Sequence, residues 1–182
     1  MRIGSPSGVA VDGGNNVYFT ENYNVGHPYS LVRMVSASTG YLSTVAGNYT
    51  KGPGYSGDTA AATNAQVNGS IGVAVDNYGN IYIGDTGNNV VRVVGAPGYH
   101  VVIPPHGIID TVVGNGFQGD YGDGGLATGA ELGEPWGVAV DATGNIYVVD
   151  GGYARVRKTT ASTGVIVTVA GNGTWGIPVT AN

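Results

Sequence analysis

The hydrophobic positions of this chain fall into short runs, and the runs come in groups of four. In the middle of the chain they read "GVAVD", "IYIGD", "VVRVVG" and "IIDTVVGNG", beginning at Gly72, Ile81, Val90 and Ile108. The segments "NYGN" and "TGNN" between the first three runs carry the Asn and Gly that favour tight turns. The pattern predicts four short strands, joined mostly by hairpins, in one antiparallel sheet.

The first half of this unit occurs three times. "GVAVDGGNNVYFTE" begins at Gly8, "GVAVDNYGNIYIGD" at Gly72 and "GVAVDATGNIYVVD" at Gly137. Consecutive residues in the second strand are apolar, so both faces of each sheet are expected to contact other protein. Sheets packed face to face around an axis form a β-propeller. We therefore predict an all-β fold: a half or partial propeller of three four-stranded antiparallel blades.

The chain is predicted to be a single repeat domain. Its expected parts are blades at about 5–50, 69–116 and 134–173, within a domain covering 1–182, and long Gly-rich crossovers at 47–70 and 114–135. The Ala-rich middle of each crossover favours one helical turn. We interpret the extra length of the repeat as a connection and not as a fifth strand.

The repeated motifs resemble those of a known family. "PWGVAVDATGNIYVVD" from Pro135, "TVAGNG" from Thr168 and "GDGGLA" from Gly122 resemble the NHL repeat, which is a propeller blade. The first repeat departs from this pattern, with Asn15 at the turn glycine and Glu21 at the aspartate. The resemblance covers the whole chain, and it implies a noncatalytic interaction or structural module.

Composition narrows the possible partners. The formal net charge is −5 and only seven residues are basic, and these are scattered along the chain. Nucleic acid is therefore excluded as a partner, because binding its backbone needs clustered Lys and Arg. Insertion into a membrane is not expected, because no apolar run approaches the ~18 residues of a spanning helix. There is no Cys, and the Gly/Asn/Thr-rich turns with little Lys favour an extracellular or periplasmic protein.

Repeated polar residues have a structural interpretation. Asp12, Asp76 and Asp141 each end a first strand and precede a turn. We expect each carboxylate to accept hydrogen bonds from its own turn, while Gly79 and Gly144 take a positive φ.

Acidic and basic residues also recur at the ends of the second and third strands. A hairpin brings such residues side by side, where a charge-assisted pair satisfies both groups between packed blades. Identical placement in each repeat indicates a scaffold role, since catalytic sites are usually asymmetric. The expected pairs are Glu21 with Arg33, Asp85 with Arg92, and Asp150 with Arg157.

No catalytic residue, metal or cofactor is predicted. The histidines His27, His100 and His106 lie in insertions and not on first strands, so they do not match the zinc site of NHL-like amidating lyases. Asp120 and Asp123 have a spacing that calcium could use, but the ordered ligand series of an EF-hand loop is missing. A hydrogen-bonded turn is the preferred interpretation, and calcium remains the alternative.

One end of the propeller is expected to carry the recognition surface. Strand direction alternates, so the loop between strands two and three of the first repeat lies at the same end as both crossovers. Loops on a rigid scaffold commonly carry recognition, and aromatic rings give large contact areas. We expect about half of these rings to be packed inward and the rest to bind protein or glycan. They are Tyr23, Tyr29, Tyr49, Tyr55, Phe117, Tyr121 and Trp136.

Self-association is the other expected property. Three blades make half of a six-bladed NHL-type ring, which leaves one apolar face open at each end. Two copies would complete six blades, or copies would stack into a filament, with Trp175 and Ile177 joining the contact. The alternative hypothesis is a fragment of a propeller hydrolase or lyase whose catalytic residues lie elsewhere.

Overall fold

The computed structural model describes residues 3–23, 25–26, 28–96 and 106–176, which form three antiparallel sheets. Sheet 1 contains β1 (Ser5–Val11), β2 (Val17–Tyr23), β3 (Tyr29–Val35) and β4 (Leu42–Ala46). Sheet 2 contains β6 (Val73–Val75), β7 (Ile81–Asp85), β8 (Val90–Val94) and β9 (Ile108–Val113). Sheet 3 contains β10 (Pro135–Val140), β11 (Ile146–Asp150), β12 (Arg155–Thr159) and β13 (Ile166–Ala170).

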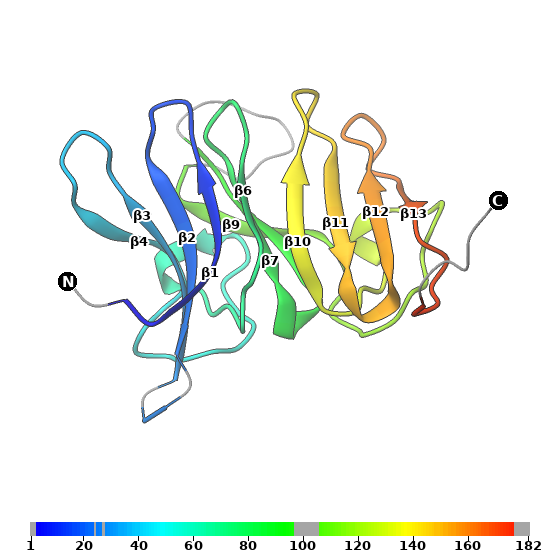
Figure 1. Ribbon diagram of the computed structural model, residues 1–182, viewed down its shortest axis with the longest axis horizontal. Coiled ribbons are helices and arrows are strands. Elements are labelled where there is room, and N and C mark those ends of the chain that lie inside the picture. Colours follow the sequence, from blue (N-terminus) through cyan, green and yellow to red (C-terminus); the bar gives the residue numbers. More distant parts are fainter. Residues whose placement is uncertain (1–2, 24, 27, 97–105, 177–182) are drawn as a thin grey trace.

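The three sheets stand side by side along the long axis of the molecule, with sheet 2 in the middle (Figure 1). Each follows the chain order from its first strand to its fourth. The described sheets do not close a ring, so the fold is an open, partial β-propeller. Fold class and strand order are those predicted from the hydrophobic pattern.

The crossovers differ from the prediction in one detail. Each contains the expected helical turn, as a 3-10 helix at η1 (Ala62–Asn64) and η3 (Ala127–Gly129). However, the first crossover also contributes β5 (Ala60–Ala61), which pairs antiparallel with β9 and makes sheet 2 five-stranded. The interpretation that the extra length adds no strand was therefore wrong here. Two alanines can pair because the crossover runs along the exposed edge of β9.

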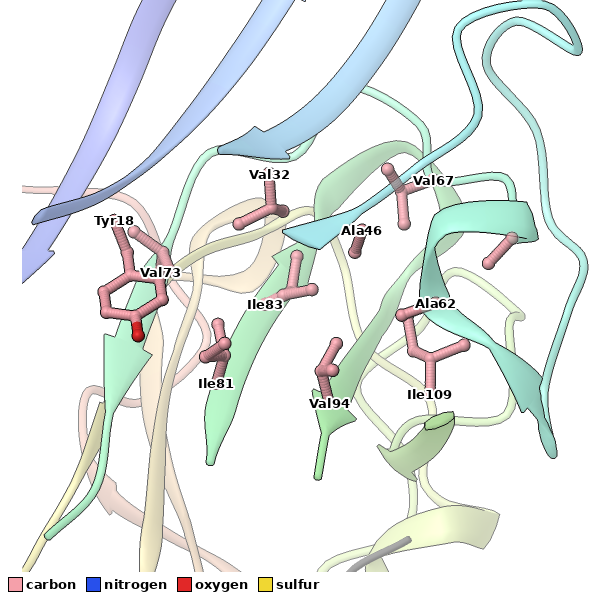
Figure 2. Packing of buried hydrophobic residues seen from close by; sticks show 11 residues of the cluster. Tyr18, Val32, Ala46, Ala62, Val67, Val73, Ile81, Ile83, Val94 and Ile109 are labelled. Atoms are coloured by element: carbon pink, nitrogen blue, oxygen red, sulfur yellow. The ribbon is translucent and has the colours of Figure 1, made fainter. Parts of the chain in front are cut away.

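Two apolar cores lie between the sheets and hold them together. The first joins Tyr18, Val32 and Ala46 of sheet 1 to Ile81 and Ile83 of sheet 2, and Figure 2 shows these side chains together with Val67 and Ala62 of the crossover. The second joins sheets 2 and 3 in the same way. Burying each Val or Ile contributes about 1.5–3 kcal/mol. Stability of the propeller therefore depends on contacts between neighbouring sheets.

The inner strands approach one another at the repeated glycine. A Cβ atom on Gly72 of sheet 2 would lie 2.8 Å from the carbonyl oxygen of Trp136 in sheet 3. Only a residue without a side chain permits this approach of backbone to backbone. This explains why "GVAVD" begins with glycine.

The aspartate that ends each first strand has the structural role predicted for it. Asp76 Oδ1 accepts hydrogen bonds from the backbone N–H groups of Tyr78 and Asn80, both at 2.9 Å, and Oδ2 accepts one from Tyr82. Gly79 takes a φ of +85°, as expected. The turns at Asp12 and Asp141 repeat these bonds. These carboxylates are therefore occupied by the scaffold.

Candidate interaction surfaces

A buried arginine on the third strand connects each of sheets 2 and 3 to its crossover. The Arg92 side chain is completely buried. It donates to the carbonyl oxygens of Ser56 at 3.1 Å and Gln66 at 3.0 Å, and it forms an ion pair with Asp58. All three partners belong to the first crossover. The guanidinium therefore fixes an irregular segment against the face of sheet 2 that packs toward sheet 1.

Sheet 3 repeats this arrangement with the second crossover. Arg157 is completely buried and donates to Asp123 Oδ1 from Nη2 at 2.7 Å and from Nε at 3.0 Å. It also donates to the carbonyl oxygen of Glu131 at 2.6 Å. Arg92 and Arg157 thus occupy equivalent nodes, which we call the arginine nodes.

The acidic residues predicted to pair with these arginines lie within ion-pair range, but farther from the guanidinium groups than the crossover aspartates do. Asp85 Oδ2 is 3.8 Å from Arg92 Nη1, and Asp150 Oδ2 is 3.6 Å from Arg157 Nη1. In sheet 1, Glu21 Oε2 and Arg33 Nη1 are 3.4 Å apart. The shorter contacts of the buried arginines go to the crossover aspartates Asp58 and Asp123, which sequence reasoning missed. The signal for them was an acidic residue at the same position of both crossovers.

Asp85 is held by bonds other than the one from arginine. Its Oδ1 accepts from the backbone N–H of Asn68 at 2.7 Å, and its Oδ2 accepts from the side-chain amide of Asn88 at 2.9 Å. Complete burial raises the pKa of Asp85 to about 7, because desolvation of the carboxylate outweighs these bonds and the attraction of Arg92.

This raised pKa predicts a pH dependence of stability. The folded state binds the Asp85 proton more tightly than the unfolded chain, so the stabilisation is complete below about pH 4 and is lost as pH rises through about 7. Between pH 5 and pH 8, the unfolding free energy of the natural chain should therefore fall more than that of Asp85→Asn, by roughly 1 kcal/mol or more. Denaturant unfolding at several pH values measures the difference. Parallel curves for the two proteins would show that Asp85 does not titrate in this range.

The carboxylates considered for calcium also contact arginines. Asp123 Oδ2 accepts from the backbone N–H of Thr168 at 2.8 Å while Oδ1 binds Arg157, and Asp120 lies 3.1 Å from Arg155. Across the described residues, no group of three His, Asp or Glu side chains is placed to hold a metal ion. His106 is exposed, whereas His27 and His100 lie outside the described residues.

The predicted aromatic surface lies at the crossover end of the sheets but is not continuous. Six of its seven rings keep 40–77% of their surface exposed, more than the half expected. Tyr23 and Tyr29 of sheet 1 stack with a centroid distance of 5.5 Å, and Tyr49 of the first crossover lies tilted against Tyr29 at 5.2 Å. We call these three rings the tyrosine stack of sheet 1. Phe117 and Tyr121 stand out from the second crossover with exposures of 71% and 77%.

Two of the predicted rings have structural contacts. Tyr55 lies over the Arg92 guanidinium at 5.1 Å, and its hydroxyl donates to Asp58 at 2.9 Å. Trp136 packs against Trp175 with a centroid distance of 6.2 Å. Tyr55 therefore belongs to an arginine node, and Trp136 belongs to the end of the row of sheets.

The outer face of sheet 3 exposes apolar side chains. We define the sheet 3 end face by residues that line a hollow of about 240 Å³, together with Val169 on the same sheet. Val149 and Trp136 are 40% exposed, Val169 49% and Trp175 67%. The defining residues are Trp136, Val149, Val156, Val169 and Trp175.

The outer face of sheet 1 is similarly uncovered. Val9 and Val11 of β1 are 68% and 56% exposed, whereas Val73, the equivalent of Val9 in sheet 2, is 7% exposed. At the other end, Val91 of sheet 2 is completely buried by sheet 3, while its equivalent Val156 remains partly exposed. The apolar exposure therefore reflects the absence of a neighbouring sheet in the described structure. We call Val9 and Val11 the sheet 1 end face.

Fold and repeat together define the class of the chain as a β-propeller. Residues 109–178, which include the second crossover and sheet 3, match the family model of the teneurin NHL domain. This match and the propeller fold confirm the resemblance to NHL repeats. The sequence matches no curated protein at a significant level.

Solved structures share the fold over most of the chain. A protein of unknown function from Bacteroides thetaiotaomicron aligns with a TM-score of 0.60, 24% identity and coverage of 93% of this chain and 36% of its own. An auxiliary nutrient binding protein from Bacteroides ovatus aligns with a TM-score of 0.61, 17% identity and coverage of 91% and 36%. A streptogramin B lyase aligns with a TM-score of 0.54, 15% identity and coverage of 92% and 41%. The chain thus spans less than half the length of these structures, and the likeness is one of fold.

None of the helices in the described residues has the length and apolar character needed to cross a lipid bilayer.

Proposed function

We propose that this chain is a noncatalytic NHL-type interaction module that self-associates through its two end faces. The observation that supports the proposal is the exposure of apolar side chains on these faces, at positions that neighbouring sheets bury elsewhere in the same chain. Exposed apolar patches of this kind favour association. The occupant that fits best is a second copy, because sheets 1 and 2 already pack together through the faces that are equivalent to the two end faces in the repeat.

The internal interface indicates how two copies would meet. Between sheets 1 and 2, Thr20 Oγ1 donates to the carbonyl oxygen of Ile71 at 2.9 Å. Val149 occupies the position of Thr20 on sheet 3 and has nearly the same shape, so a similar approach is sterically possible. The sheet 3 end face of one copy would then cover the sheet 1 end face of the other. A twofold arrangement gives six sheets, and a different step gives a filament.

Lys158 limits how apolar this contact is. It occupies the position of the buried Val93, and its ammonium group lies 5.5 Å from the centre of the Tyr147 ring. The outer part of the sheet 3 end face is therefore charged, and we expect the inner part around Val149 to supply most of the association energy.

The two tryptophans of the chain provide a direct test. Both Trp136 and Trp175 belong to the sheet 3 end face, and the sequence has no other tryptophan. If this face is covered in the assembly, diluting the protein should shift tryptophan emission to longer wavelength as the rings become hydrated. Emission that stays constant over a hundredfold dilution would argue against burial of this face.

We further propose that the exposed rings of the second crossover contact a protein partner. Tyr and Phe side chains supply contact area at low entropic cost, and rings of this exposure are candidates for the centre of an interface. The double variant Phe117→Ala/Tyr121→Ala should weaken binding of a partner captured from the natural source by at least tenfold, with Tyr41→Ala as the control. Unchanged binding of that partner would place the contact elsewhere, and binding only to a glycan array would favour a glycan ligand.

A propeller hydrolase or lyase is the alternative function. It would need carboxylates or histidines that converge on the inner strands, whereas the described inner strands read Val-Ala-Val in all three sheets. The likeness to a streptogramin B lyase is a likeness of fold. The interaction module therefore accounts better for the residues present.

A further inference from the structure

A groove with a mixed polar and apolar lining lies between sheets 2 and 3, at the end opposite to the crossover aromatics. Its volume is about 640 Å³, which falls within the range of ligand sites. It begins between the β6–β7 and β10–β11 turns, which are seen side by side in Figure 1, and continues to the outer strand β9. Both sheets and the second crossover contribute to its walls.

The groove lies where the repeats differ from one another. Strand register places Asp110 of sheet 2 at the position of Ser43 in sheet 1. Thr159 of sheet 3 is likewise equivalent to Val94 of sheet 2, since each faces the first isoleucine of the preceding strand. Residues that repeat in every sheet serve the scaffold, as the turn aspartates do. Thr159 is a hydroxyl residue where the other two sheets have valine, and Asp110 is a carboxylate where sheet 1 has serine, so neither side chain repeats with the scaffold.

Thr159 supplies a second, independent observation. It lines the groove and is 95% buried, and its hydroxyl oxygen has no hydrogen-bond partner among the described residues. Buried hydroxyl groups are normally bonded, and leaving one unbonded costs stability. Valine fills this position in sheets 1 and 2, as Val35 and Val94, so the fold does not require the hydroxyl. Rotation about χ1 carries the hydroxyl to another staggered position, in which a ligand in the groove would supply the missing partner.

The lining chemistry selects the class of ligand. The described lining residues include no Lys, Arg or His, and they include Asp110 and several threonines, which disfavours an anion. Carboxylate and hydroxyl groups bind sugar hydroxyls, and the 65% exposed Leu126 offers an apolar surface to the C–H face of a ring. We propose that this groove binds a neutral oligosaccharide. The proposal does not depend on self-association or on the crossover aromatics.

The test is a titration of the protein with a panel of neutral trisaccharides built from glucose, galactose, mannose or N-acetylglucosamine. Calorimetry and NMR measure the binding. At least one trisaccharide should bind at millimolar concentration. Thr159→Val should weaken that binding about fivefold through the lost hydrogen bond, and Asp110→Asn about tenfold through the lost charge. Thr159→Val should leave the melting temperature unchanged or raise it, because valine is the natural residue at the equivalent positions.

Thr168→Val is the matched control. The Thr168 hydroxyl is also buried, but it lies outside the groove, near the Asp123 carboxylate, at a position that is threonine in all three sheets. This variant should bind the trisaccharide as the natural chain does. The proposal is overturned if no trisaccharide binds, or if Thr159→Val and Asp110→Asn bind as tightly as Thr168→Val.

Discussion

Replacing Arg92 with Met is expected to lower the free energy of unfolding by about 3–5 kcal/mol. The side chain is completely buried, and its removal takes the cationic partner from Asp58 and Asp85 and a donor from two carbonyl oxygens of the first crossover. Met fills most of the volume, so the loss comes from stranded polar groups and not from a cavity. Arg157→Met should have an effect of the same size in sheet 3, because its contacts are equivalent.

Arg155→Met provides the control for this prediction. Arg155 forms an ion pair with Asp120, which is about half exposed, so solvent screens the interaction and its loss should cost less than about 1 kcal/mol. Chemical denaturation of the three variants measures the difference directly. Equal losses for Arg92→Met and Arg155→Met would mean that the arginine nodes do not hold the crossovers in place.

The second large effect is expected from Val149→Glu, which should abolish self-association. Val149 lies in the hollow of the sheet 3 end face, beside Val156 and both tryptophans. A carboxylate there would be buried mainly against apolar groups when a second copy covers the face, and Arg155, the cation that lines the hollow, is already paired with Asp120. Burying a charge in this way costs several kcal/mol. The isolated chain tolerates the change because Val149 is 40% exposed, so the folded monomer should persist.

The matched variant for this experiment is Val25→Glu. Val25 is 72% exposed in the loop between β2 and β3, away from both end faces. The Val25→Glu substitution adds the same charge to the chain, so it controls for general repulsion between negatively charged copies. Dissociation by both variants alike would implicate net charge, and dissociation by neither would remove the sheet 3 end face from the contact.

The regular part of this fold could be predicted from the sequence because the repeat occurs three times. The apolar runs, the turn glycine and the aspartate of each turn recur together, and local chemistry determines the hairpins. The crossovers are different, because their paths depend on contacts made far away in the chain. Asp58 and Asp123 are separated from their arginines by 34 residues, so the signal for the arginine nodes was not a local pattern but the matching aspartates of the two crossovers.

The aromatic surface shows a related limit. Alternating strand direction placed seven rings at one end of the sheets, but it carried no information on how far each lies from its neighbours. The structure separates them into the tyrosine stack of sheet 1, Tyr55 at an arginine node, the second crossover and the sheet 3 end face. The groove between sheets 2 and 3 was missed for the opposite reason: its residues depart from the repeat, whereas the sequence argument concentrated on residues that follow it.

The central claim is that the open end faces bind each other, and the mass of the protein in solution tests it most directly. Light scattering coupled to size-exclusion chromatography, over a hundredfold range of concentration, should give a species of at least twice the chain mass of 18.3 kDa, with Val149→Glu reduced to the single chain. A natural chain that remains at 18.3 kDa throughout that range would contradict the account.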